Sequence, residues 1–584
     1  MQPHGKLSTR LFLVFTSLMV ALLAACGKNA GINGFSTIPP TSTVNGTPRS
    51  SYDKQIYRFP ILGADLDIKS FDPAFTPDLY SAQAIEMVFV GLVRLDDNLQ
   101  VQPELAQSWE QSADSLQWTF HLRPNLTFSD GTSLTSSDVA YSIDRALQHN
   151  LQAPYSLTYL GLIKDSDKLY AGQIKTIIGD SILTPDANTV IIKTNKKAAY
   201  FLYALTYPTS YVVEKKLIEE YGNTKFTEHL TEGGGAGPFT VSQYQHKKEI
   251  DFVPNPYYYS YKPILQKVVF SFVPDPTTAY QQYQSGQLDF TYVPRTRFNE
   301  ASQLTKEYYR TPILATSYLA MNFLVKPFDN LYIRQAFALS IQRETINNTI
   351  YSGQEIPSYH IIPQGMVGYN LNLTGPAGVK NSKGDFNRAR QLLQVGLQQE
   401  GWSDVSQVPP IKLTYGKSST ADKVITMLTQ MWQSVLGVNV VPDPVTFNTS
   451  VTEENQAVNN PKGIQMWFAG WVADYPDPQD WTTLQFDKGS AQNSMNYGQN
   501  NSTDALQEQV VQHQLEQADA ETNPSNRILL YDSAEQQLIN AVAWIPLFQQ
   551  TEIALLKPYV QGVVLNPLEI TPPDDWANVY IGMH

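Results

Sequence analysis

The sequence predicts an α/β fold. From residue 52 onward, short segments in which apolar and polar residues alternate are interleaved with segments of helical apolar spacing. The chain has 584 residues, which is enough for two or three domains with substantial cores. Its single cysteine, Cys26, excludes any intramolecular disulfide, so we expect the cores alone to hold the fold together.

The N-terminus has the layout of an export signal. Lys6 and Arg10 precede the apolar segment 11–25, which ends in small residues. About 15 apolar residues would span about 22 Å as a helix, which is less than the roughly 30 Å of a bilayer core. We therefore expect a signal peptide rather than a permanent membrane span.

Cys26 directly follows this segment. The tetrapeptide Leu23-Ala24-Ala25-Cys26 resembles a bacterial lipobox, which implies cleavage after residue 25 and attachment of diacylglycerol to the Cys26 thiol. An ordinary signal peptide with an incidental cysteine is the alternative. Residues 27–51 contain 18 Gly, Pro, Ser, Thr or Asn among 25 positions, which is typical of a flexible tether.

The charge of the chain excludes some partners. Its formal net charge is −13, and both nucleic acids and anionic lipid surfaces favour basic partners. We therefore expect no nucleic-acid partner, and a lipid on Cys26 rather than surface charge would supply attachment to a membrane. The sequence has no second apolar stretch long enough to cross one.

Several segments have clear periodicity. Residues 117–124 alternate as a strand, a turn is expected at residues 129–131, and residues 133–148 have capping residues and helical spacing. Residues 250–259 are expected to form a strand that ends in Asn-Pro. Farther along, a strand at 411–416 lies between amphipathic helices at 387–402 and 421–438, both of which close at glycine.

Common catalytic and nucleotide-binding motifs are absent. The sequence contains neither G-x-S-x-G nor H-E-x-x-H, and the GKS at 416–418 has Ile411 where a phosphate-binding loop needs its first glycine. The glycine-rich run EGGGAGPF (232–239) is not followed by Lys-Ser/Thr and a helix, so we expect a tight turn into a strand there. We expect no catalytic residue, no cofactor and no metal.

One segment, AGWVADYPDPQDW (469–481), combines carboxylates with aromatic rings. Its aspartates are three residues apart, at Asp474, Asp477 and Asp480, among Trp471, Tyr475, Trp481 and the prolines Pro476 and Pro478. Paired carboxylates are used in glycoside hydrolysis, alternating carboxylates bind calcium, and a desolvated aspartate between rings receives a cationic group. A solvated Asp-Pro turn remains a fourth interpretation, and the prolines are expected to exclude a regular helix.

The ordered set of segments resembles the family 5 extracellular solute-binding proteins, the peptide and oligopeptide receptors of ABC importers. The similar segments are FDPAF (71–75), GLVRLDDNLQVQPELAQSWE (91–110), WTFHLRPNLTFSDGTSLTSSDVAYSIDRAL (118–147), GAGPF (235–239), PNPYYY (254–259), YQSGQLDFTYVP (283–294), MNFLVKPFDNLYIRQAFALSIQRETI (321–346), GWVADYPDP (470–478) and RILLYDSAEQQLINAVAWIPLF (527–548).

This resemblance implies a two-lobed periplasmic-binding-protein-like fold (type II, cluster C) with an extra subdomain inserted in the first lobe. The implied first lobe comprises residues 52–92, 211–306 and 542–584, the inserted subdomain 93–210, and the second lobe 307–541. The lobes would close over a ligand without making or breaking a bond in it, and the protein is expected to be a monomer.

The resemblance also implies a ligand site. In peptide-binding members the Asp of the W-x-x-D segment accepts the α-ammonium group of the ligand, a role that falls on Asp474, helped by the Ala473 carbonyl. Trp471 and Tyr475 would shape the first pocket. Further expected pocket walls are Tyr155, Phe447, Phe548 and the backbone near Asp78 and Leu79.

The sequence departs from that pattern at the other end of the ligand. Some oligopeptide receptors have basic residues where this chain has Phe468 and Asp422, and Lys326 is the remaining candidate partner for a peptide carboxylate. The expected partners are a peptide ligand, the permease subunits of an ABC transporter and the membrane. Nickel chelates, saccharides, haem and opines remain alternative ligands, and a glycoside hydrolase using Asp474, Asp477 and Asp480 is the alternative from another class.

Overall fold

A computed structural model describes residues 43–44, 47–76 and 78–584. The chain divides into two compact units, Met1–Pro48 and Arg49–His584. In the first, the short strands β1 (Thr43–Val44) and β2 (Thr47–Pro48) pair antiparallel. The predicted signal segment, Cys26 and most of the predicted tether lie outside the described residues. Within the part of the chain that is described, no helix is both long and apolar enough to span a bilayer.

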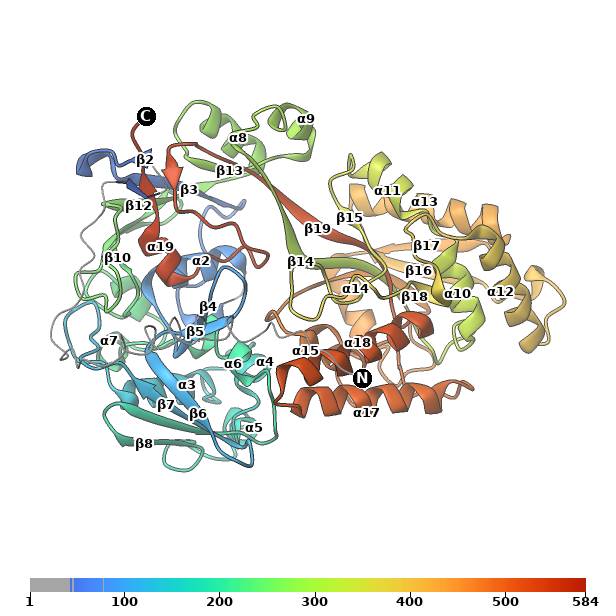
Figure 1. The fold of residues 1–584 in the computed structure, drawn as a ribbon, viewed down its shortest axis with the longest axis horizontal. Helices are drawn as coiled ribbons and strands as arrows, with labels where there is room; N and C mark the ends of the chain where they lie inside the picture. Colours follow the sequence, from blue (N-terminus) through green and yellow to red (C-terminus); the bar gives the residue numbers. More distant parts are fainter. Residues whose placement is uncertain (1–42, 45–46, 77) are drawn as a thin grey trace, which may run out of the picture. The chain divides into compact units, whose positions relative to one another are not determined.

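Arg49–His584 contains three main sheets (Figure 1). The first has the strand order β10 (Phe239–Gln245), β11 (Glu249–Pro254), β12 (Lys267–Val273) and β3 (Ile56–Leu62), with only the last pair parallel. The second is antiparallel, in the order β6 (Ala106–Gln111), β7 (Gln117–Leu122), β9 (Thr189–Lys193) and β8 (Ile182–Asp186). Small pairs are formed by β4 (Val93–Leu95) with β5 (Val101–Pro103) and by β20 (Val560–Gln561) with β21 (Tyr580–Ile581).

The third sheet has seven strands. Its order is β13 (Phe290–Tyr292), β19 (Ile545–Leu556), β14 (Tyr308–Met321), β18 (Met466–Val472), β16 (Ile411–Gly416) and β17 (Val440–Val445), and β15 (Ile356–Pro357) pairs with β19. Strands β14 and β19 are the longest. One end of β19 packs in the core of the first sheet through Ala554 and Leu556, and its other end packs in the largest core through Ile545 and Leu547. These two paired strands therefore connect the two cores.

Helices surround these sheets. The α-helices are α2 (Leu79–Val88), α3 (Ser136–Ala146), α4 (Ser156–Leu160), α5 (Ser166–Tyr170), α6 (Phe201–Ala204), α7 (Lys215–Tyr221), α8 (Pro276–Gln284), α9 (Phe298–Ala301), α10 (Leu331–Leu339), α11 (Arg343–Ile350), α12 (Phe386–Gln399), α13 (Ser419–Leu436), α14 (Phe447–Asn455), α15 (Pro478–Trp481), α16 (Thr483–Phe486), α17 (Ala505–Ala520), α18 (Pro524–Ala541) and α19 (Pro573–Asn578). Short 3₁₀ turns are η1 (Tyr52–Lys54), η2 (Pro73–Phe75), η3 (Pro208–Ser210), η4 (Phe226–His229), η5 (Arg295–Arg297), η6 (Pro376–Gly378) and η7 (Val405–Gln407).

The periodic segments form the elements that their patterns predict. The alternating segment 117–124 contains β7, residues 133–148 contain α3, and residues 411–416 are β16. Helix α13 ends at Gly437, whose φ of 71° is the left-handed conformation that glycine adopts without strain. One expectation is wrong, because Pro478 does not exclude a helix. Pro478 begins the short helix α15. At this first helical position a backbone N–H would have no intrahelical acceptor, so its absence in proline costs nothing.

The boundaries of the lobes stay a prediction. The seven-stranded sheet takes β13 and β19 from segments predicted for the first lobe, and β14 to β18 from the segment predicted for the second. The antiparallel sheet of β6 to β9 lies wholly within the segment 93–210 predicted as an inserted subdomain.

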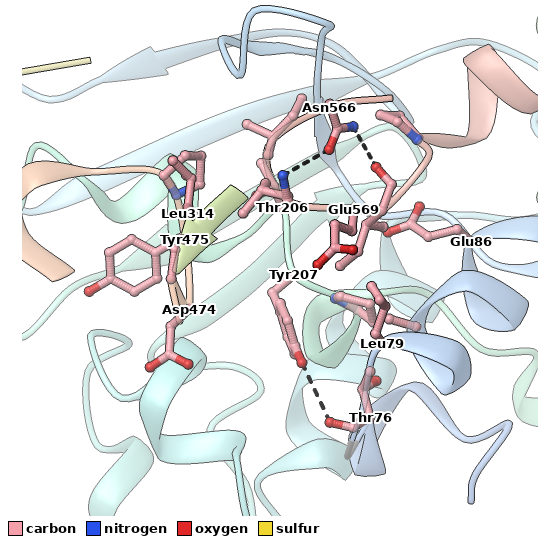
Figure 2. Close-up of a pocket in the computed structure, with 18 of the residues that line it drawn as sticks. Thr76, Leu79, Glu86, Thr206, Tyr207, Leu314, Asp474, Tyr475, Asn566 and Glu569 are labelled. Atoms are coloured by element: carbon pink, nitrogen blue, oxygen red, sulfur yellow. Dashed lines mark hydrogen bonds between the residues drawn. The ribbon is translucent and has the colours of Figure 1, made fainter. Parts of the chain in front are cut away.

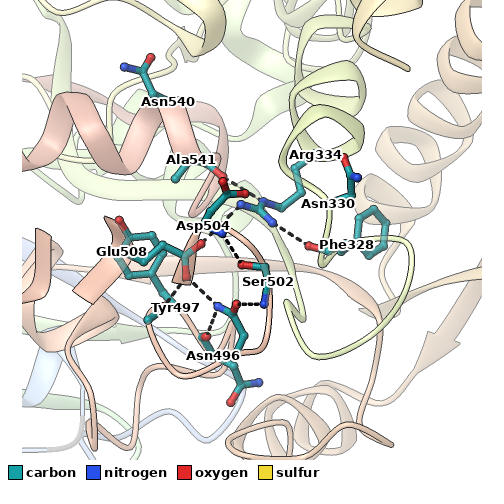
Figure 3. Close-up of polar contacts among 12 residues, drawn as sticks. Phe328, Asn330, Arg334, Asn496, Tyr497, Ser502, Asp504, Glu508, Asn540 and Ala541 are labelled. Atoms are coloured by element: carbon teal, nitrogen blue, oxygen red, sulfur yellow. Dashed lines mark hydrogen bonds and ion pairs between the residues drawn. The ribbon is translucent and has the colours of Figure 1, made fainter. Parts of the chain in front are cut away.

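A buried arginine connects helices α10, α17 and α18 (Figure 3). Arg334 of α10 is fully buried and donates from Nε to the Ala541 carbonyl oxygen at 2.9 Å and from Nη1 to the Phe328 carbonyl oxygen at 2.9 Å. Its guanidinium also lies 3.6 Å from the Glu508 carboxylate of α17. Because these partners belong to different helices and loops, Arg334 fixes α10 against the ends of α17 and α18.

The segment after β18 is held by a second buried ion pair. Arg527 of α18 donates two hydrogen bonds, of 2.7 and 2.6 Å, to the two carboxylate oxygens of Asp477. The Asp477 side chain is 0% exposed, and it also caps α15 through the Gln479 N–H. This bidentate pair fixes the segment that carries Asp474 onto α18.

The glycine-rich run 232–239 is a turn into β10, as predicted. A Cβ added at Gly235 would lie 2.1 Å from the Val88 carbonyl oxygen at the end of α2. The turn can therefore pack against α2 because Gly235 has no side chain.

We predict that Gly235→Ala destabilises the protein by about 1–3 kcal/mol, because the added methyl group forces the turn away from α2. The midpoint of urea denaturation measures this effect. Gly63→Ala is the matched control, since no atom lies within 4 Å of its added Cβ and its φ is not positive. Equal stability of the two variants would contradict the close packing at Gly235.

We also predict that Arg527→Met destabilises the protein by about 3–5 kcal/mol, because it leaves the buried Asp477 carboxylate without a partner. Arg297→Met removes an exposed ion pair with Glu300 and should cost less than about 1 kcal/mol. Thermal and urea denaturation of both variants measure the difference. A loss at Arg527 no larger than that at Arg297 would show that the pair does not hold the segment.

Candidate ligand-binding site

A cavity of about 300 Å³ lies in Arg49–His584 beside the end of β18 (Figure 2). Its wall is built from α2, the β4 segment, α4, the turn at 206–211, β14, the segment after β18 and the loop 566–573. Of the residues expected at a ligand site from the sequence, the cavity brings together Asp78, Leu79, Tyr155, Ala473, Asp474 and Tyr475.

Asp474 is placed by hydrogen bonds on both sides of its segment. The Ala473 N–H donates to the Leu314 carbonyl oxygen of β14 at 2.9 Å, which continues the pairing of β14 with β18. The Asp474 N–H donates to the Asp480 carboxylate at 3.3 Å, and the Tyr159 hydroxyl donates to Asp474 Oδ1 at 3.2 Å. The carboxylate of Asp474 is therefore held at the cavity wall.

Two stacked tyrosines form the wall next to it. The rings of Tyr159 and Tyr207 lie 3.7 Å apart with an interplanar angle of 6°, and the Tyr207 hydroxyl donates to the Thr76 carbonyl oxygen at 3.5 Å (Figure 2). On the other side of Asp474, the Tyr475 ring stacks on Tyr200 at 5.9 Å. Rigid aromatic walls of this kind suit a ligand that combines apolar and polar parts.

Asp480 supports Asp474 from behind. Its side chain is 0% exposed and accepts a hydrogen bond of 3.0 Å from the Trp471 indole N–H. Trp471 is partly buried, does not line the cavity and holds Asp480 through this hydrogen bond. Its role as a wall of the first ligand pocket stays a prediction.

The electrostatics of the site favour a cation. Burial raises the pKa of Asp474, and the Tyr159 hydrogen bond opposes this shift only in part. Burial, followed by the nearby charge of Asp474, raises the pKa of Asp480 as well. Burial is the largest cause of both pKa shifts. Among the described residues, no cation is in contact with either carboxylate to oppose them.

Arg94 is the basic residue of the cavity wall, but its guanidinium is already paired with two carboxylates. Its Nε lies 3.1 Å from the Glu104 carboxylate and 3.2 Å from the Asp574 carboxylate. The wall also includes Asp78, which caps α2, and the acids Glu86 and Glu569. Within the described residues, the lining is therefore net acidic.

Three residues expected near the ligand lie away from this cavity. Phe447 is 73% exposed at the start of α14, and Phe548 is 1% exposed and packs on the Tyr351 ring in the largest core. Lys326 lies 3.1 Å from Asp329, forms an ion pair with Glu400 and lines a separate cavity. In the described conformation, none of the three contributes to the site around Asp474.

The cavity also contains Tyr159, Tyr207, Glu86 and Glu569, which are not among the expected site residues. Tyr159 follows Tyr155 by four residues, which places both on one face of α4, so this spacing was the available signal. The hydrogen bond from Tyr159 to Asp474 connects residues 315 positions apart, and no local pattern encodes such a contact.

The three aspartates of the segment 469–481 do not come together in the cavity. Asp477 is bound to Arg527 and Asp480 is fully buried, so only Asp474 of the three aspartates lines the cavity. In the residues that the structure describes, no group of three or more His, Cys, Asp or Glu side chains could hold a metal ion. The spacing of the aspartates therefore does not build a calcium site in this segment.

The chain is similar to known binding proteins along most of its length. It is 26% identical to the "Dipeptide-binding protein DppE" of Bacillus subtilis, covering 85% of this chain and 88% of the relative. It is also 26% identical to the "Periplasmic oligopeptide-binding protein OppA" of Escherichia coli, covering 89% and 91%.

The fold is similar to that of a solved structure titled "MppA Periplasmic Murein Tripeptide Binding Protein, Unliganded Open Form". The TM-score is 0.77 at 24% identity, and the match covers 93% of this chain and 99% of that chain. The mixed α/β architecture of Arg49–His584 is thus the two-lobed solute-binding fold.

A protein-family match covers the middle of the chain. Residues 100–493, about two thirds of the chain, match the family described as "Bacterial extracellular solute-binding proteins, family 5 Middle". The chain belongs to the family 5 extracellular solute-binding proteins.

Proposed function

We propose that this protein is a lipid-anchored receptor that captures peptides outside the cytoplasm and delivers them to the permease of an ABC importer. The observation that carries the proposal is the Asp474 carboxylate, which lines the cavity and is not compensated by any cation among the residues that the structure describes. The names of the relatives, which are dipeptide- and oligopeptide-binding proteins, support the same ligand class.

The α-ammonium group of a peptide supplies the charge that the site lacks. In the free protein, Asp474 is desolvated and its pKa is raised, so its ionised form is costly. An ammonium group next to Asp474 would favour the ionised form and donate charge-assisted hydrogen bonds to it. Tyr159, which already donates to Oδ1, keeps the carboxylate oriented for this contact.

The backbone of the ligand has a place to bind beside Asp474. Strand β16 pairs with β18 only as far as Tyr415 and Phe468. Among the described residues, the segment 469–472 therefore has no strand partner on that side, whereas β14 covers the other side as far as Val472. An extended peptide would add to this free edge through main-chain hydrogen bonds, leaving its side chains to neighbouring pockets.

Closure of the two lobes would complete the site. The cavity wall combines α2 and α4 with β14 and the end of β18, and these elements pack in three different cores, two of which are connected by β14 and β19. A peptide that contacts both sides favours the closed arrangement over the open one. We propose that Phe447, Phe548 and Lys326 come near the ligand only in the closed state.

We predict that Asp474→Asn weakens binding of a tripeptide by about 100- to 4,000-fold, because losing one partner of a buried charge pair costs about 3–5 kcal/mol. Acetylation of the peptide's α-amino group should weaken binding to the parent protein by a similar factor and should add little to the effect of Asp474→Asn. Isothermal titration calorimetry on chains lacking residues 1–51 measures all four combinations.

Asp65→Asn, at an exposed position outside the cavity, is the matched control and should bind as the parent does. Because the pKa of Asp474 is raised, its carboxylate is protonated at a higher pH than that of an ordinary aspartate. Affinity for the free peptide should therefore fall as the pH is lowered from 7 to 5, and affinity for the acetylated peptide should not. Tight binding of a sugar, a nickel chelate or haem but of no peptide would contradict the proposed ligand.

We predict that Cys26 carries the anchor. The mature chain should begin at Cys26, carry a diacylglyceryl thioether and partition into detergent, whereas Cys26→Ala should remain unlipidated. Intact-mass measurement of protein purified from bacterial membranes tests this. An unmodified Cys26, or a mature chain that starts at another residue, would contradict the anchor without affecting the ligand site.

A further inference from the structure

A second, smaller cavity adjoins the ligand site. Asn566 and Glu569 line both cavities, so the loop 566–570 forms the wall between them. Aromatic rings form much of the second cavity, and they belong to Tyr57, Phe59, Phe290, Tyr292 and Trp576. The rings of Phe59 and Phe290 stack at 4.9 Å, and Tyr292 meets the edge of Phe290 at 5.0 Å with an interplanar angle of 88°.

Two carboxylates lie among the polar groups of this cavity, together with hydroxyl, amide and indole groups that can donate. Its lining includes the carboxylates Glu552 and Glu569 and contains no Lys, Arg or His. Gln83 donates from its side-chain nitrogen to the Glu569 carbonyl oxygen, which fixes the orientation of the amide. As a result, Gln83 Oε1 is buried without a hydrogen-bond donor among the described residues, although the side chain is only 3% exposed.

Neither Glu552 nor Glu569 forms an ion pair with a basic residue in the part of the chain that the structure describes. The positive charge of Arg295 lowers the pKa of Glu552, but the Arg295 side chain is 53% exposed. Its guanidinium lies 3.5 Å from the Glu355 carboxylate and pairs with that group instead. Burial, together with repulsion from Glu569, raises the pKa of Glu552 to about 8, and burial raises that of Glu569 to about 7. Two neighbouring acids without a cation destabilise the free protein, so a bound cation would relieve this cost.

We propose that this second cavity is a side-chain pocket for the ammonium group of a lysine-type residue in the bound ligand. An ammonium group has three donors and no acceptor, and Glu552, Glu569 and Gln83 Oε1 offer the acceptors that it needs. Aromatic rings also attract a cation held over their faces.

The size of the cavity fits this ligand group. It holds about 40 Å³ of free space, and one water needs about 10–15 Å³ by the same measure. There is accordingly room for about three non-hydrogen atoms, which corresponds to an ammonium nitrogen and the last two methylenes of a lysine. A whole aromatic side chain would not fit. The inference rests on the proposed peptide function and narrows it to peptides that contain a basic residue.

The test compares lysine with norleucine, which has the same chain without the charge. Calorimetry would measure binding of alanine tripeptides with either residue at the first, second or third position. At one position, the parent protein should bind the lysine peptide at least about tenfold more tightly than the norleucine peptide. Glu552→Gln combined with Glu569→Gln should abolish this preference. Glu552→Gln alone, which changes only the second cavity, should leave the affinity for the norleucine peptide within about twofold.

Glu110→Gln, whose side chain is 78% exposed, is the matched control and should keep the lysine preference. Because glutamine removes uncompensated charge, the double variant should melt no lower than the parent at pH 8, which checks that it is folded. Equal affinity for lysine and norleucine peptides at every position, or a preference that survives in the double variant, would overturn the inference.

The same experiment separates the two proposals. Asp474→Asn should weaken lysine and norleucine peptides by the same factor, because it acts on the α-ammonium group alone. If that effect is found without a lysine preference, the side-chain pocket is refuted and the peptide function stands. If no tripeptide binds the parent protein, the peptide function fails and the pocket inference fails with it.

Discussion

A desolvated carboxylate without a compensating cation is the constraint on which the ligand site depends. Asp474 lies at the cavity wall with Asp480 behind it, and the basic residue of that wall, Arg94, is already paired with Glu104 and Asp574. Burial without a counter-charge is unfavourable for the free protein and favourable for binding a cation. The site is thus prepared for a ligand that brings positive charge, at the expense of the stability of the unliganded state.

Three contacts keep the Asp474 carboxylate in place. Strand β14 holds the preceding residue through a main-chain hydrogen bond, the Arg527–Asp477 pair holds the following residues onto α18, and Tyr159 reaches from α4 to the carboxylate itself. Two of these supports lie in the core of the seven-stranded sheet and the third lies in a different core. A relative movement of the cores would therefore change the surroundings of Asp474, which gives ligand binding a route to lobe closure.

Local patterns in the sequence were sufficient for the α/β class and for elements such as β7, β16 and α13, because their periodicity and caps are encoded within each segment. The resemblance to a family singled out Asp474. The different roles of Asp477 and Asp480 were not predictable, since they depend on Arg527 and Trp471 in the folded chain. Likewise, Glu552 and Glu569 come together with Tyr57 and Gln83 only through tertiary packing. The spacing of these residues along the chain does not predict such a cavity.

The central claim is that Asp474 receives the α-ammonium group of a peptide. A crystal structure of the chain with a bound tripeptide tests it most directly. The account predicts a closed arrangement in which the ammonium nitrogen lies within about 3.2 Å of the Asp474 carboxylate and the ligand backbone pairs with residues 469–472. A peptide bound with its α-ammonium group remote from Asp474, or bound in the reverse direction, would contradict it.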